Sequence, residues 1–129
     1  MNRLVLVCLV VVFLFANCQK KEEPKVQSQV PAGTMVMQDK ILQLQELVRQ
    51  DPKNLNAWIG LGNSLMDSGR FPEAVDAYQK ALEIDPKNTD VRVDMGTCYR
   101  SAGQSDKAAE EYKKAIASNP GHPNAHINL

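Results

Sequence analysis

The side chains that could perform chemistry in this chain are few. His122 and His126 lie four residues apart, a spacing that can place two imidazoles on one helical face as metal ligands. Pro123 lies between them, which indicates that His122 precedes the helix, and no cysteine or carboxylate cluster is close in sequence. We therefore expect one loop histidine and one helix histidine rather than a metal site.

Nucleophiles and phosphate-binding loops lack the neighbours that would make them active. The candidate hydroxyls are expected at helix surfaces or turns, without a base; they belong to Ser64, Ser68, Ser101 and Ser105. Gly60-Leu61-Gly62 lacks the Gly-Lys-Ser or Gly-Lys-Thr of a phosphate loop. We also expect Glu110 and Glu111 on a solvated helix face, with Glu110 able to pair with Lys114. The chain is therefore predicted not to be an enzyme and to use no cofactor or metal.

Length and charge narrow the class further. A chain of 129 residues suffices for one small domain. Fifteen Lys and Arg residues balance fifteen Asp and Glu residues, so the basic surface that nucleic-acid binding needs is missing. Aromatic residues make up 5% of the chain, too few for a base-stacking platform. We predict no nucleic-acid partner.

The N-terminal segment has the layout of an export signal. Arg3 precedes an apolar run over 4–16, and Cys18 follows just before a polar stretch. As a helix the run would measure about 20 Å, short of the ~30 Å hydrocarbon core of a bilayer. The segment resembles a bacterial lipoprotein signal, which implies cleavage after residue 17 and lipid on the Cys18 thiol; Phe15 and Asn17 depart from that pattern. The alternative is an uncleaved anchor, and both place the protein at a membrane.

Residues 18–35 are predicted to be a flexible polar tether, because they include Pro24 and Pro31 and show no helical periodicity. From Met37 apolar residues recur at helical spacing and indicate a helix over about 36–50, within an N-terminal half repeat at 36–54. Removal of the signal would leave Cys98 as the one unmodified cysteine, with a packing role.

The rest of the chain repeats itself. Residues 55–88 and 89–122 align without a gap at a spacing of 34 residues, and a third unit begins at 123–129. The matched pairs include Gly62 with Gly96, Gly69 with Gly103, Ala74 with Ala108, Tyr78 with Tyr112, Ala81 with Ala115, and Pro86 with Pro120. With Trp58, Leu61 and Leu65 these residues resemble the tetratricopeptide repeat (TPR) family, although Arg92 stands where the family often has Trp. The resemblance implies an all-α solenoid of antiparallel helix hairpins.

Each repeated residue type has a mechanical reason. Gly62 and Ala74 are small enough for the two helices of a unit to approach closely, and Tyr78 is expected to fill the space between them. Gly69 can adopt the left-handed conformation that ends the first helix, and Pro72 fits the first turn of the second.

The resemblance also implies a binding surface, because this family presents the inner faces of its first helices as a groove for peptides or partner domains. The groove positions here would be Asn56, Ile59, Asn63, Met66, Asp67, Asp90, Val93, Thr97, Arg100 and Ser101. Asn63 matches a carboxylate-binding Asn of one subfamily, but Ile59 and Thr97 replace the Lys and second Asn of that clamp. We therefore do not expect binding of a C-terminal carboxylate, and Asn63 and Arg100 remain as hydrogen-bond donors.

These features predict a protein–protein interaction module tethered to the bacterial cell envelope, which binds a protein or peptide through its groove. The alternative is a docking or regulatory subunit of an envelope enzyme or cytochrome-maturation complex. Gln19 lacks the Asp of inner-membrane retention and weakly favours the outer membrane. The partial third unit predicts either a piece of a longer repeat protein or self-association through 123–129.

Overall fold

The computed structural model describes residues 32–128. Within them six helices follow one another: α2 (Ala32–Gln50), α3 (Leu55–Asp67), α4 (Phe71–Ile84), α5 (Thr89–Ser101), α6 (Ser105–Ser118) and α7 (Pro123–Asn128). The described residues contain no strand, so the all-α prediction is confirmed. The predicted signal at 1–17, Cys18 and most of the tether lie outside the described residues, and their structure stays a prediction.

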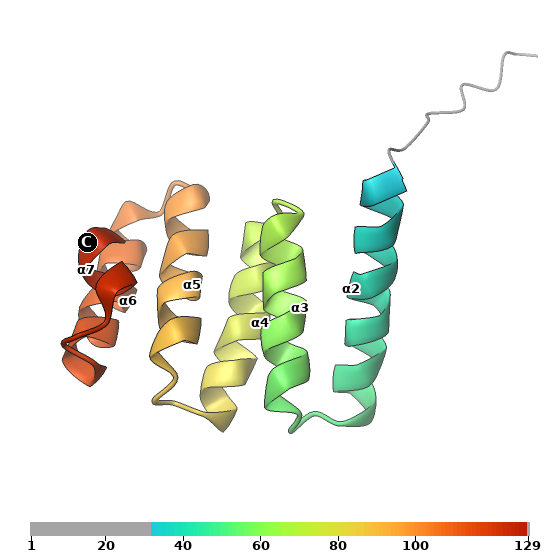
Figure 1. Ribbon diagram of the computed structural model, residues 1–129, viewed down its shortest axis with the longest axis horizontal. Coiled ribbons are helices and arrows are strands. Elements are labelled where there is room, and N and C mark those ends of the chain that lie inside the picture. The colour runs from blue at the N-terminus through green and yellow to red at the C-terminus, as the bar shows by residue number, and fades with distance from the viewer. Residues whose placement is uncertain (1–31, 129) are drawn as a thin grey trace, which may run out of the picture.

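The helices stack in chain order as successive antiparallel hairpins (Figure 1). Each helix packs mainly on its neighbours in sequence, and α7 also touches α5. Helix α2 begins at Ala32, four residues before the expected start at 36. Each of α3 to α6 lies within the unit that the repeat alignment gave it. None of the described helices is both long enough and apolar enough to span a bilayer.

The ends of the helices are set by residues that recur with the repeat. The Asn54 and Asn88 Oδ1 atoms accept hydrogen bonds from the amides of Ala57 (3.0 Å) and Val91 (3.1 Å), which caps α3 and α5. Gly69 and Gly103 follow these helices at φ 72° and 77°. Because caps and glycines recur every 34 residues, both units begin and end in the same register.

The core confirms the close approach expected of each hairpin. Tyr78 and Tyr112 are fully buried, and each ring lies against the glycine of its own first helix, at Gly62 or Gly96. A Cβ added at Gly62 would lie 2.5 Å from Tyr78 Cε1, so only glycine fits. Trp58 is half-buried instead, and its Nε1 donates to the Pro52 carbonyl oxygen at 2.9 Å.

The buried side chains form two clusters. The larger runs from Ile41 of α2 to Cys98 of α5, and the smaller joins Val93 to Tyr112 and to Ala125 of α7. Tyr99 packs against both clusters. The burial of Cys98 agrees with its expected packing role.

Candidate functional site

The predicted groove lies on α3 and α5, the first helices of the two complete units. Tyr78 of α4 reaches this face from below, and its hydroxyl donates to Asn63 Oδ1 at 2.6 Å. The Met66 sulfur lies 4.0 Å from the same hydroxyl oxygen. Because Asn63 Oδ1 accepts this bond, the orientation of the amide is fixed and its NH2 group is the part that can donate to a ligand.

Two carboxylates act on the same tyrosine. Burial is the main cause that raises the pKa of Tyr78, and the charges of Asp94 and Asp67 raise it further. Asp94 comes from α5 and Asp67 from the end of α3, so both helices contribute charge near this hydroxyl. We refer to Asn63, Asp67, Tyr78 and Asp94 as the Tyr78 cluster.

Asp94 is the unusual member of the Tyr78 cluster. Its side chain is half-buried, and within residues 32–128 no hydrogen bond or ion pair engages its carboxylate. Burial raises the pKa of Asp94, the charge of Asp90 raises it further, and His122 lowers it. The corresponding residue one unit earlier is Gly60, which packs on Leu44. The acidic group therefore belongs to the seam between α4 and α5 alone.

In the second unit, the residues that follow in sequence engage much of the predicted groove. His122 Nε2 lies 2.7 Å from Asp90 Oδ1, and an Arg100 nitrogen donates to Asn128 Oδ1 at 2.9 Å. The Thr97 hydroxyl lies 3.2 Å from the Tyr112 hydroxyl, which repeats the Asn63–Tyr78 contact.

Val93 is 4% exposed because it packs in the cluster that contains Ala125 of α7. It is therefore not available to a partner, and we withdraw it from the groove. The remaining predicted positions are exposed or half-buried; they are Asn56, Ile59, Asn63, Met66, Asp67, Asp90, Thr97, Arg100 and Ser101. Their role in binding stays a prediction.

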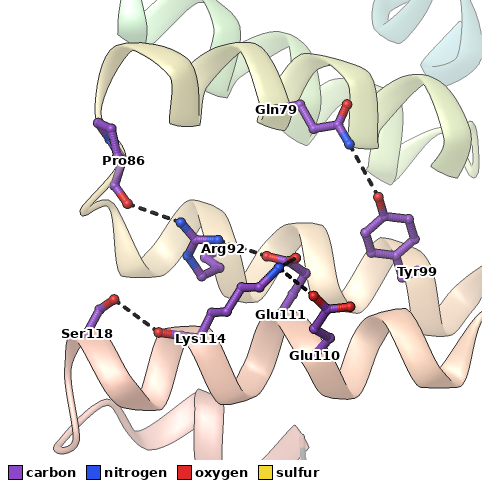
Figure 2. Close-up of polar contacts among 8 residues, drawn as sticks. All are labelled: Gln79, Pro86, Arg92, Tyr99, Glu110, Glu111, Lys114 and Ser118. Atoms are coloured by element: carbon purple, nitrogen blue, oxygen red, sulfur yellow. Dashed lines mark hydrogen bonds and ion pairs between the residues drawn. The ribbon is translucent and has the colours of Figure 1, made fainter.

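Sequence reasoning missed a salt-bridge network that joins α5 to α6 (Figure 2). Arg92 occupies the position where Trp was expected, and it donates to Glu111 Oε2 at 2.9 Å and to the Pro86 carbonyl oxygen at 3.1 Å. Lys114 bridges Glu110 and Glu111, each at 2.8 Å. The Glu110–Lys114 pair was expected, but the solvated position for Glu111 was wrong, because Glu111 turns inward to meet Arg92 and is 8% exposed.

Ser64 was also misplaced by the sequence. It is fully buried, and of the buried side-chain atoms in residues 32–128 its hydroxyl oxygen is the one that lacks a hydrogen-bond partner. One unit later the same position holds Cys98, which is also fully buried. The alignment of Ser64 with Cys98 was the signal that could have placed this serine in the core.

The two histidines bind protein groups. His122 Nδ1 accepts from the Ala125 amide at 3.3 Å, at the repeat position where Asn54 and Asn88 cap their helices. His126 Nε2 lies 2.7 Å from the Pro120 carbonyl oxygen. Across residues 32–128 no group of three potential ligands is arranged to hold a metal ion.

The repeat geometry agrees with a comparison of the sequence with known families. Residues 65–129, half of the chain, match the model described as tetratricopeptide repeat. The chain belongs to the tetratricopeptide repeat family. The TPR match covers α4 to α7 and part of α3.

Solved structures support the TPR assignment. A crystal structure of MamA shares 29% sequence identity and a TM-score of 0.69, over 74% of this chain and 56% of that one. YrrB, described as a TPR protein with an unusual peptide-binding site, shares 25% identity and a TM-score of 0.68, over 74% of this chain and 49% of that one. The Arabidopsis OM64 TPR domain, at 18% identity and a TM-score of 0.67, shows the same fold over 74% of this chain and 79% of that one.

This chain spans about half the length of the MamA and YrrB structures that it resembles. No curated protein matches its sequence. TPR membership and the likeness to MamA and YrrB support a protein–protein interaction module.

Proposed function

We propose that the chain is a lipid-anchored TPR module of the bacterial cell envelope, which binds a protein partner through the α3–α5 face. The observation that carries the binding face is Asn63. Its oxygen is held by Tyr78 at 2.6 Å, so its amide NH2 is oriented in advance as a donor. A donor fixed before binding loses little conformational entropy when a partner's carbonyl group accepts from it.

The similarity to YrrB adds support, because that TPR protein is described as having a peptide-binding site. Met66 and Ile59 are half-buried on α3 beside Asn63 and offer apolar contact to a peptide side chain. The α3–α5 face thus combines a polar anchor with adaptable apolar surface.

Crosslinking in intact cells, followed by mass spectrometry, tests the binding face. We expect the double variant Asn63→Ala with Arg100→Ala to lose most of the crosslinked partner recovered with the unchanged chain. The matched control is Gln79→Ala with Lys107→Ala, which removes two exposed polar side chains from α4 and α6. Equal recovery from both double variants, at unchanged helicity, would reject the α3–α5 face as the binding surface.

The lipid anchor is tested separately. The support for it is Cys18 directly after the apolar run, because two or more acyl chains on one cysteine give stable membrane attachment. We expect mass spectrometry of the membrane fraction to find a peptide that begins at lipid-modified Cys18, and Cys18→Ser to prevent that modification. An intact Met1 terminus would favour an uncleaved anchor.

A further inference from the structure

We propose that the Tyr78 cluster receives a cationic side chain, a lysine or an arginine, from the protein partner. This inference rests on the proposed function, because it takes the α3–α5 face as the binding surface. It adds the charge of the group that the face selects.

The first argument is the state of Asp94. A carboxylate that is partly removed from water is normally compensated by an ion pair or by hydrogen bonds. Glu111 shows the compensated case in this molecule, because Arg92 and Lys114 both contact it. For Asp94 no such contact is found within residues 32–128, so a cation supplied from outside would recover the lost solvation.

The second argument is the chemistry around Asp94. The charges of Asp94 and Asp67 both act on the Tyr78 hydroxyl, so the two carboxylates share one neighbourhood. Asp90 adds to the same negative field, since its charge acts on Asp94. A partner carboxylate would meet repulsion there, whereas an ammonium or guanidinium group would be attracted by more than one carboxylate.

The positive groups of this face do not cancel that field. Arg100 is directed to Asn128, and His122 faces Asp90 and only partly offsets the effect of Asp90 on Asp94. The seam between α2 and α3 has Gly60 against Leu44 at the corresponding place, so it offers no second carboxylate. The structure thus assigns one cation position to the face, beside the Asn63 amide that would hold the partner's backbone.

Selection from a phage library of random dodecapeptides tests the proposal with the full chain held in detergent. We expect peptides bound by the unchanged chain to be enriched in Lys or Arg at one position. Asp94→Asn keeps the shape of the side chain and removes its charge, and it should abolish that enrichment. The matched control, Asp76→Asn, removes an exposed carboxylate of α4 outside the cluster and should leave the enrichment intact.

A double-mutant cycle then measures the contact itself. The best lysine peptide and its norleucine analogue are titrated against the unchanged chain and against Asp94→Asn. We expect each single change to weaken binding roughly tenfold, and the two together to weaken it little more than either alone. Independent, multiplying effects would show that the lysine contacts another group and would overturn the proposal.

The same experiments separate this inference from the proposed function. Peptides that need Asn63 but show neither Lys or Arg enrichment nor coupling to Asp94 would overturn the cation site and leave the binding face standing. An absence of selected peptides, or peptides whose binding ignores both Asn63 and Asp94, would overturn both. Circular dichroism of Asp94→Asn checks that the variant is folded, so a loss of binding cannot come from unfolding.

Discussion

At the scale of single residues, the two helix glycines decide how closely each hairpin packs. Replacing Gly62 with Ala should destabilise the protein by about 1–3 kcal/mol, because the added Cβ would lie 2.5 Å from the Tyr78 ring. Helix propensity alone predicts the opposite sign, a gain of about 1 kcal/mol. Urea denaturation measures the difference.

The matched control for this substitution is Gly60→Ala on the same helix. Its Cβ would meet the mobile end of Leu44 at 3.2 Å, so Leu44 can move aside and the cost should be smaller. An equal or larger loss of stability for Gly60→Ala would contradict the account given for Gly62.

Asp94 provides a second prediction at this scale. Burial raises the pKa of this carboxyl above its unfolded value, so its ionised form destabilises the folded state at pH values above the folded pKa. We expect Asp94→Asn to raise the Tm at pH 7, and the difference to shrink as the pH falls through the folded pKa toward the unfolded value. Thermal denaturation across this pH range checks both the sign and the window. A lower Tm for Asp94→Asn at pH 7 would show that the charge is already compensated.

Residue-level prediction from sequence succeeded where a residue's environment lies within its own unit. Gly62, Tyr78 and Cys98 were placed correctly for that reason. Asp94 was missed because its isolation depends on Tyr78, which belongs to the preceding unit. No pattern in the linear sequence marks a charge whose lack of a partner arises from the contact between two units.

At the scale of elements, the contact between α5 and α6 depends on the ion pair of Arg92 with Glu111. Their side chains are 18% and 11% exposed, so removal of either partner leaves a poorly hydrated charge. We expect Glu111→Ala to cost about 2–4 kcal/mol, and the double variant Arg92→Ala with Glu111→Ala to cost less than the sum of the two single changes. Chemical denaturation of all four forms gives the coupling, and strict additivity would mean that the pair acts independently.

The start of α5 depends on one side chain. Asn88→Ala should cost about 1 kcal/mol, because the Val91 amide loses its cap at 3.1 Å. Asn88→Asp is the control and should retain most of the stability, since its carboxylate can accept the same bond. Equal losses for Ala and Asp would indicate that Asn88 acts through another contact, such as its 3.3 Å bond to Asp85.

The elements themselves were largely predictable, because glycine, proline and small residues recur every 34 residues and mark the hairpins. The first helix was the exception, as α2 begins at Ala32. Pro31 directly precedes it, and proline disfavours helix before itself but not after it. The proline that suggested a tether therefore marks the boundary where the helix begins.

At the scale of the whole molecule, stability is distributed along a stack whose elements contact mainly their sequence neighbours. Removing residues 123–129 would expose Val93 and Tyr112, which α7 helps to cover. We expect hydrogen exchange to become faster in α5 and α6 while α2 to α4 keep most of their protection. Uniform loss of protection across the chain would show that the stack unfolds as one cooperative unit.

The neighbour-only packing also bears on how the molecule responds to a pulling force. Since no long-range pairing ties the first described helix to the last, tension between the ends would be resisted by one hairpin contact at a time. Under load the chain would extend in steps and rewind when released, since contacts local in sequence form quickly. A partner captured on such a stack would be held by an extensible spring.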